Sequence, residues 1–531
     1  MAGAPPPEPA VTAGVSLDAA TATPSPRYAR YVLTLLVIVY VLNFIDRQII
    51  SILAEDIKRD LGLSDADLGF LYGTAFGVFY ALFGIPLGRL ADNWNRVKLM
   101  ASGLAIWSAA TAVSAFARTG GMLTGARIGV GIGEATASPC AYSLISDYFP
   151  KEKRATALAI YSSGLYIGGG LSLFIGGAIV KSWNQAYPGG GPLGLVGWQA
   201  AFLAVGIPGL ILAAIVTTLR EPLRGQTDGI ITPPTPNPFR GFLEELVTVI
   251  PPLTLIGAAR RGTSALLINL AVAAGIVASV FLLIRLTGGY AQWIAVGIGC
   301  YAVYSWATAL RRRDPPTFQM IWGTPAFLCA VIGYGLIAFL AYSTSFWSAP
   351  YALRLLGADP AYAGFILGGI GAGGGFLGVV LGGQLADRLR RSNASGRVLV
   401  ILGGLVLPLV PMVIAFTTRD MTLFYVMVAL AQVTSAMALG AAAATTQDLV
   451  LPRMRGTATA TFFLGTTLIG LSLGPYLAGF MSQAIGDLGY GVLSLLVVVP
   501  ISLAALLYLY RSLPAAEESR LDRARAAGEP I

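Results

Sequence analysis

Histidine is absent from this 531-residue sequence, and charged residues are scarce. Without imidazole the chain has no means for Ser-His or Cys-His nucleophilic catalysis or for histidine-based proton relay and zinc binding. Only 11% of the residues are charged, whereas an ordinary globular domain carries roughly 25%. A soluble fold cannot use so much apolar surface, and the bilayer is therefore the expected solvent.

Cysteine is almost absent as well. Cys140, Cys300 and Cys329 fall inside apolar segments and show neither paired nor metal-type spacing, so they are expected to be small packing residues. The glycine runs follow no predicted strand and precede no Lys-Ser/Thr pair, which argues against a phosphate-binding loop. No cofactor, no metal site and no enzymatic activity are predicted.

What the chain has in abundance is long apolar runs, with hydrophobic residues making up 55% of it. Stretches of about 20 residues, the length that crosses roughly 30 Å of hydrocarbon, recur from Tyr31 to Tyr510. The expected helices of the first half are 31–53, 68–90, 97–117, 121–146, 154–180 and 197–219. A Pro-rich stretch and an amphipathic piece near 242–259 then precede two further runs, 264–284 and 289–310. Six more follow at 320–350, 362–386, 397–417, 421–447, 456–483 and 488–511.

These runs predict an all-α membrane protein of about 14 helices, organised as two six-helix bundles with an inserted transmembrane helix pair between them. The expected domains are a disordered cytoplasmic tail (1–26), an N-terminal bundle (27–220), a linker with an amphipathic segment and the inserted helices (221–317), a C-terminal bundle (318–511) and a cytoplasmic tail (512–531). The first segment lacks the basic stretch and apolar core of a signal peptide.

Arginine and lysine gather in alternate short loops, which predicts that those loops are cytoplasmic and that both termini are too. The net charge of +9 comes with Arg and Lys residues that sit in short loops, where they fix orientation, so no nucleic-acid partner is expected. Scarce lysine beside abundant Arg, Ala and Gly is typical of a high-GC bacterium. We expect a multi-pass protein of the bacterial inner membrane.

Two features recur in the same order in the two halves. The segment 88–92 (Gly-Arg-Leu-Ala-Asp) matches 383–387 (Gly-Gln-Leu-Ala-Asp), and Asp147 with 154–157 matches Asp448 with 455–458. Duplicated halves of this kind place a substrate site between them, near the membrane midplane.

At these residues the sequence resembles the major facilitator superfamily, whose loop after the second helix carries Gly-x-Leu-Ala-Asp followed by basic residues. Asn93 and Asn95 depart from that pattern. The segment 127–135 resembles the second signature of the superfamily, and 43–47 (Asn-Phe-Ile-Asp-Arg) is similar to spinster-like transporters. The resemblance implies the major facilitator fold and proton-linked or facilitated movement of a small amphiphilic or anionic organic molecule, lysolipid-like in the eukaryotic cases. The partners implied are that substrate, protons and membrane lipids, with the chain expected to be a monomer.

Asp46 and Arg127 are the proposed centre of proton coupling. A charge near the middle of a transmembrane helix costs at least about 2.5–3.5 kcal/mol, so such residues usually face a cavity or a partner. Asp46 lies about 10 Å and Arg127 about 9 Å from the outer ends of their predicted helices, at 1.5 Å per residue. Asn43 and Arg47 share the side of Asp46 and are substrate-cavity candidates. Arg47 either holds Asp46 or binds an anionic head group, and a pair snorkelling to the interface is the alternative.

Glu134 lies two turns after Arg127 on the same helix face and is a second proton-site candidate. A structural carboxyl that bridges helices is its alternative interpretation. For Asp92, the resemblance implies a gate closed by ion pairs with Arg96 and Arg154, and Asp387 is its second-half copy. Solvated loop carboxylates are the alternative for both aspartates. Glycines crowd 164–177 and 368–383, where small residues let helices approach and slide.

The predicted function is secondary active transport by alternating access, with proton coupling. One alternative is an uncoupled facilitator in which Asp46 is structural. The other is a membrane receptor or assembly subunit that does not transport.

Overall fold

The computed structural model describes residues 25–228, 236–260 and 262–529. Residues 1–24 of the expected N-terminal tail lie outside the described residues, and so do residues 229–235 of the linker. Every regular element in the described part is helical. Within a bilayer this is expected, because a helix satisfies its backbone N–H and C=O groups internally. The prediction of an all-α membrane protein is confirmed.

The first half contains the six helices that the apolar runs predict. They are α2 (Pro26–Leu61), α3–η1–α4 (Asp65–Gly69, Phe70–Thr74 and Ala75–Asn93), α5 (Arg96–Ser114), α6–α7 (Gly120–Glu134 and Ala137–Tyr148), α8 (Lys151–Ala186) and α9 (Gly197–Val216). The fourth is broken at residues 135–136, where a continuous helix was expected. Helix α2 begins with Pro26 under the Ser25 cap and ends at left-handed Gly62, so it runs eight residues past its predicted end at residue 53.

The second half repeats this arrangement with six further helices. They are α15 (Pro325–Leu355), α16–η4–α17 (Pro360–Gly369, Ile370–Gly374 and Gly375–Ser392), α18–α19 (Gly396–Val406 and Leu409–Ala415), α20 (Met421–Asp448), η5–α21–η6–α22 (Pro452–Met454, Arg455–Gly465, Thr466–Leu471 and Gly474–Ile485) and α23–η7–α24 (Leu488–Ser494, Leu495–Val498 and Val499–Glu518). The segment 512–531 was expected to be a tail, but its described part is mostly helical. Helix α24 extends into it as far as Glu518, and α25 (Arg520–Ala526) follows.

The insertion between the halves contains an L-shaped pair of short helices and a helical hairpin. Helices α10 (Pro238–Val249) and α11 (Leu253–Arg260) meet at a 96° bend, at the two prolines where an interruption was expected. The hairpin consists of α12 (Thr263–Thr287) and α13 (Tyr290–Arg313), and α14 (Pro315–Ile321) leads into the second half. Thirteen described helices are long and apolar enough to span a membrane. The fourteenth expected helix is the one predicted at 121–146, where the structure has the two shorter helices α6 and α7.

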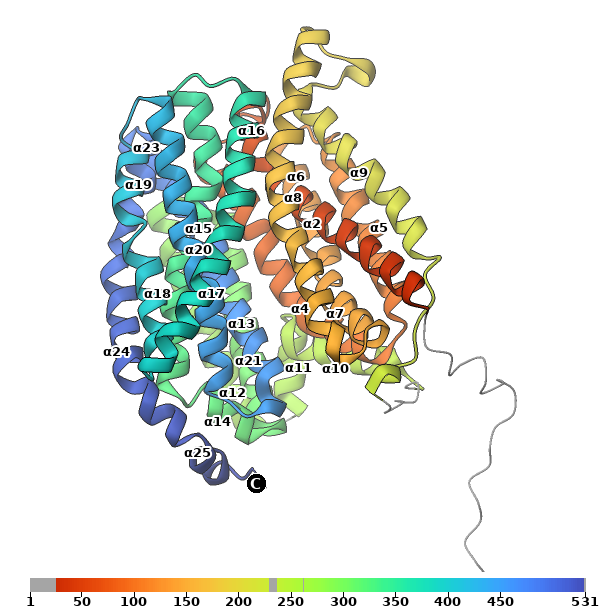
Figure 1. Cartoon of the computed structure of the whole chain (residues 1–531), viewed down its shortest axis with the longest axis vertical. Helices are drawn as coiled ribbons and strands as arrows, with labels where there is room; N and C mark the ends of the chain where they lie inside the picture. The colour runs from red at the N-terminus through yellow and green to blue at the C-terminus, as the bar shows by residue number, and fades with distance from the viewer. Residues whose placement is uncertain (1–24, 229–235, 261, 530–531) are drawn as a thin grey trace, which may run out of the picture.

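The molecule has two ends, which differ in chemistry. The end that carries α10, α11, α14 and α25 is the lower one in Figure 1, and α16 lies at the upper end. We call the lower end the basic face, because the last turn of α13 with Arg311, Arg312 and Arg313 leads into α14 there, and Arg453 binds Asp314 beside α14. We call the upper end the opposite face. The two halves pack against each other through three helix pairs: α2 with α15, α8 with α16, and α3 with α22.

Glycine makes the close approach of the halves possible near the opposite face. A Cβ on Gly368 would lie 2.4 Å from the carbonyl oxygen of Gly170, and a Cβ on Gly364 would lie 2.2 Å from that of Leu173. Both contacts join α16 or its end to α8. Backbones touch there, and no side chain fits between them.

Candidate transport site and gates

Four ionisable side chains from α2 and α6 come together inside the first half. They are Asp46, Arg47, Arg127 and Glu134, and the exposed fraction of the residue is 0% for Asp46 and 1% for Arg127 and Glu134. All four belong to the set that the sequence singles out. Charges so deep in a membrane bundle are kept only where they are paired or used.

Arg47 pairs with Glu134, a partner that the sequence did not assign to it. Its Nη2 donates to Glu134 Oε2 at 2.8 Å, and the Arg47 side chain keeps 13% exposure while that of Glu134 keeps none. The guanidinium carbon also lies 4.7, 4.5 and 5.0 Å from the ring centroids of Phe44, Phe76 and Tyr80. A planar cation seated among aromatic faces is held in place by the ring quadrupoles.

Asp46 has no such pairing. Neither of its carboxylate oxygens has a hydrogen-bond partner among the described residues. Arg127 does approach, but its Nη1 donates to the backbone carbonyl of Asp46 at 3.1 Å, while its Nη2 has no partner in the described part. The nearest donors to the carboxyl are Nε1 of Trp107 and the hydroxyl of Thr111, both on α5, and neither has a partner at hydrogen-bond geometry in the described part. Asp46 and Arg127, which were predicted to lie at one depth, are therefore in contact, but the contact is between the Arg127 side chain and the backbone of Asp46.

Asn43 lies one turn before Arg47 and is 2% exposed. Its side chain lies beside Glu134. Asn43, Asp46 and Arg47 thus share one side of α2, as helical spacing predicts.

At the basic face, Arg96 is the centre of a buried polar cluster. Its side chain is fully buried; Nε donates to Glu221 at 2.7 Å, Nη2 donates to the carbonyl of Pro222 at 2.8 Å, and Nη1 donates to Asp147. Asp92, the partner implied by the resemblance, is exposed and makes no ion pair within the described residues in this conformation. Arg154 donates to the carbonyl of Ser146 at 2.9 Å.

The second half contains a matching pair, Arg397 with Asp448. Asp387 is 71% exposed, and its Oδ1 lies 3.8 Å from Arg397 Nη2. Asp147 and Asp448 occupy equivalent positions in the internal repeat. The repeat could therefore have indicated that these two carboxylates pair with Arg96 and Arg397. Glu221 had no such signal.

The opposite face carries an ion-pair cluster that the sequence analysis missed. Arg354 of α15 donates to Asp65 at 2.7 and 2.8 Å and to Glu55 at 2.7 and 3.1 Å. Lys58 and Ser482 also bind Asp65, at 2.6 and 2.9 Å. A second bridge joins Lys181 to Asp359 at 3.0 Å. We call the set Glu55, Lys58, Asp65, Arg354 and Ser482 the closure cluster, since it joins the two halves.

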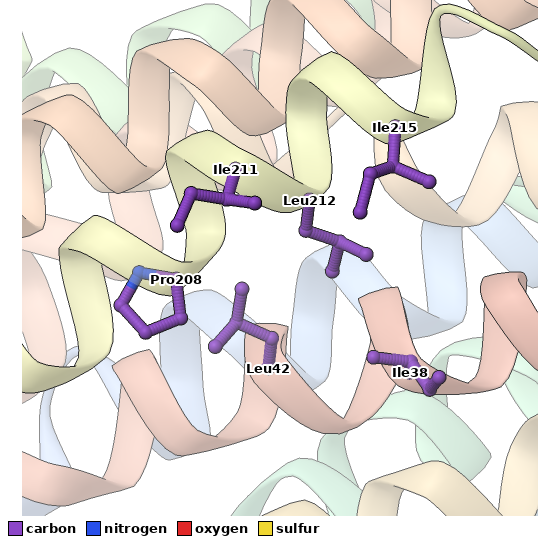
Figure 2. Close-up of a pocket in the computed structure, with 6 residues that line it drawn as sticks. All are labelled: Ile38, Leu42, Pro208, Ile211, Leu212 and Ile215. Atoms are coloured by element: carbon purple, nitrogen blue, oxygen red, sulfur yellow. The ribbon is translucent and has the colours of Figure 1, made fainter.

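A separate apolar pocket of about 230 Å³, open to the outer surface of the bundle, lies between α2 and α9. Its lining residues are Ile38, Leu42, Pro208, Ile211, Leu212 and Ile215, which come from two facing helices; Figure 2 shows Leu42 and Leu212 extending into the gap between them. None of them can donate or accept a hydrogen bond from its side chain. The pocket therefore offers no head-group chemistry.

A family model described as the Major Facilitator Superfamily matches residues 36–353 and 337–531. The chain belongs to this superfamily. A protein of Mycolicibacterium smegmatis named as an MFS-type efflux pump is 26% identical, over 87% of this chain and 86% of its own length. Human protein spinster homolog 1 is 25% identical, over 86% of this chain and 74% of its own length.

The solved structures agree with the sequence relatives. A bacterial homolog to the human lysosomal transporter Spinster, in an inward-facing and unoccupied conformation, superposes with a TM-score of 0.65 and 26% identity, over 95% of this chain and 97% of that one. The predicted fold and the resemblance to spinster-like transporters are thereby confirmed. The chain is a spinster-type transporter of the major facilitator superfamily and not an enzyme.

Proposed function

We propose that this transporter couples the movement of a small amphiphilic or anionic organic molecule to protons, by alternating access. The observation that carries the proposal is the carboxyl of Asp46, fully buried and without a hydrogen-bond partner in the described part. A lone buried carboxylate is costly, and a bound proton removes that cost. The same group becomes free to ionise once water or a cation reaches it.

Arg127 is the proposed switching partner of Asp46. It already touches the backbone of Asp46 at 3.1 Å, and its Nη2 is unoccupied among the described residues. Pairing would stabilise the ionised form of Asp46 and release the proton.

Arg47 and Asn43 are proposed to contact the substrate, with Glu134 as the counter-charge of Arg47. Arg47 keeps 13% exposure, and its Nε has no partner in the described residues. An anionic head group could therefore compete with Glu134 for the fork of the guanidinium, while the rings of Phe76 and Tyr80 offer an apolar surface beside it. A displaced Glu134 would then be able to take up a second proton.

The closure cluster supports an arrangement in which the opposite face is sealed. If the basic face is cytoplasmic, as the distribution of Arg and Lys predicts, this conformation corresponds to the inward-facing one described for the bacterial spinster homolog. Asp92, which makes no ion pair among the described residues, and Asp387, whose contact with Arg397 is 3.8 Å long, are proposed to form their gate ion pairs when the basic face closes. We place the chain in a bacterial inner membrane as a monomer, with both termini in the cytoplasm.

The test uses purified protein in liposomes that enclose a pH-sensitive dye. Lysolipids, sphingoid phosphates, carboxylates and sugars are added in turn to wild type, Asp46→Asn and Asp522→Asn. Asp522 is an exposed residue of α25 with a side-chain exposure of 79% and serves as a matched control for the charge change. We expect substrate-dependent proton movement in wild type and in the control, and none above background in Asp46→Asn.

Substrate flux that is equal in all three proteins, with no pH change, would identify an uncoupled facilitator. Binding of a probe without flux would instead identify a receptor. Either result would contradict the proposal.

A further inference from the structure

The inserted helical hairpin has two unequal helices. Helix α13 packs against η1 and α4 of the first half and against η6 of the second, whereas α12 packs on α13 and α11. In their most apolar 18-residue windows, 56% of α13 is buried and only 6% of α12. Helix α12 therefore faces lipid, and α13 lies over the line where the two halves meet.

Near the start of α13, the side chain of Gln292 forms hydrogen bonds to both halves at the line where they meet. The Gln292 Nε2 donates to the backbone carbonyl of Ser472 at 3.0 Å, and its Oε1 lies 2.6 Å from the hydroxyl of Thr74. The Thr74 hydroxyl is also 2.5 Å from the same Ser472 carbonyl. Thr74 belongs to the first half, Ser472 to the second and Gln292 to the insertion, and all three are at most 1% exposed. We call these three residues the seam node.

The seam node lies where both neighbouring helices are irregular. Thr74 ends the π-helical turn η1, and Ser472 directly follows the π-helical turn η6. Backbones touch there, since a Cβ on Gly73 would lie 2.2 Å from the carbonyl of Leu471. Single π-helical turns often mark functional positions in helices. The ring of Trp293 packs edge-on against Tyr476 at 5.8 Å and extends the contact of α13 with the second half.

We propose that α13 is a brace for the rocking of the two halves, and that Gln292 is the positioning residue through which it acts. An amide and a hydroxyl buried at membrane depth have to keep hydrogen-bond partners. Separating the halves along this line breaks the bonds that Gln292 makes to both of them, so the brace favours the conformation with the opposite face closed. The inserted hairpin thus takes part in the conformational cycle. A hairpin that only packed on the outside of the bundle and contacted lipid would not take part in this cycle.

The test measures conformation directly and needs no substrate. Cysteines replace Ala186, at the exposed end of α8, and Thr422, at the exposed start of α20, in a protein whose three native cysteines are changed to alanine. Spin labels at these positions report the distance between the halves at the opposite face. Gln292→Leu removes the amide, and Thr74→Val removes the hydroxyl with little change of shape.

Asn269→Leu is the matched control, because Asn269 is a buried amide of α12 that donates only within its own helix, to the carbonyl of Ala265 at 2.8 Å. We expect a longer-distance population in Gln292→Leu and Thr74→Val, with the open-to-closed ratio raised roughly threefold to tenfold, as loss of one or two intramembrane hydrogen bonds implies. Asn269→Leu should match wild type.

Wild-type distance distributions in both node variants would overturn the proposal, and so would the same shift in Asn269→Leu. If Gln292→Leu does not give a monodisperse protein, Thr74→Val decides the matter alone. Because no proton or substrate enters the measurement, its failure leaves the proposed coupling through Asp46 untouched.

Discussion

Arg354 binds Asp65 through both of its terminal nitrogens, at 2.8 and 2.7 Å, across 289 residues of sequence. Asp65 opens the second helix of the first half, and Arg354 lies at the end of the first helix of the second half. The side chain of Asp65 is 4% exposed and that of Arg354 is 25% exposed. Bidentate pairing of a guanidinium with a largely buried carboxylate is among the stronger charge interactions in proteins.

Arg354→Gln is therefore expected to open the opposite face. The change leaves Asp65 and Glu55 without their shared cation, and Lys58 alone cannot replace a bidentate fork. The spin-label distance between positions 186 and 422 should gain a longer component that accounts for most of the population.

Arg419→Gln is the matched control. Arg419 lies on the same face, but its partner Asp487, at 3.7 Å, belongs to the same half. An unchanged distance in Arg354→Gln, or an equal change in Arg419→Gln, would show that the closure cluster does not hold the halves together.

The number and order of the helices of the two halves could be predicted from the sequence, because a run of apolar residues of spanning length has one stable solution in a bilayer. Helix ends were less exact, since α2 runs eight residues past its predicted end. The start of α5 was placed within one residue and that of α20 correctly. The break of the fourth helix at 135–136 was missed, since neither of those residues, Ala135 and Thr136, is a strong helix breaker.

The partners of the site residues could be predicted only where counting residues along a helix gives their position. Asp46 and Arg127 were placed at one depth by counting residues, and they do lie in contact. That Arg47 meets Glu134 depends on how α2 and α6 are rotated about their axes, which helical spacing within each does not determine. Arg354 and Asp65 meet only because the halves pack in one particular way.

Arg96→Gln is expected to destabilise the protein more than the equivalent change Arg397→Gln. Arg96 is fully buried and binds two carboxylates, Asp147 and Glu221, and their loss of a partner should cost about 3–5 kcal/mol of unfolding free energy. Arg397 and Asp448 are 20% and 34% exposed, which should limit the cost to about 1 kcal/mol. Unfolding in mixed detergent micelles, followed by circular dichroism, measures both. Equal losses would mean that burial does not set the strength of these pairs.

Asp314 should make stability depend on pH in the acid range. Its carboxylate accepts hydrogen bonds from Arg453, which lower the pKa of Asp314 to about 2 in the folded protein, against about 3.9 in an unfolded chain. Since the folded pKa is the lower one, the stabilisation is present above about pH 4 and is lost as the pH falls toward 2. The melting temperature of Asp314→Asn should lie below that of wild type at pH 7, with the gap closing between pH 4 and pH 2. Curves that run parallel over this range would contradict it.

Gly368→Ala is expected to prevent the opposite face from closing. The new Cβ would lie 2.4 Å from the carbonyl oxygen of Gly170 on the other half, a distance at which backbone has to move. Gly369→Ala is the control, because a Cβ at the next position meets nothing within 4 Å. Both residues lie within α16, so the two variants gain the same helix propensity. Spin labels at 186 and 422 should show the longer distance in Gly368→Ala alone. A closed distance in Gly368→Ala would contradict the prediction and would mean that the close approach of α8 and α16 is not required for closure.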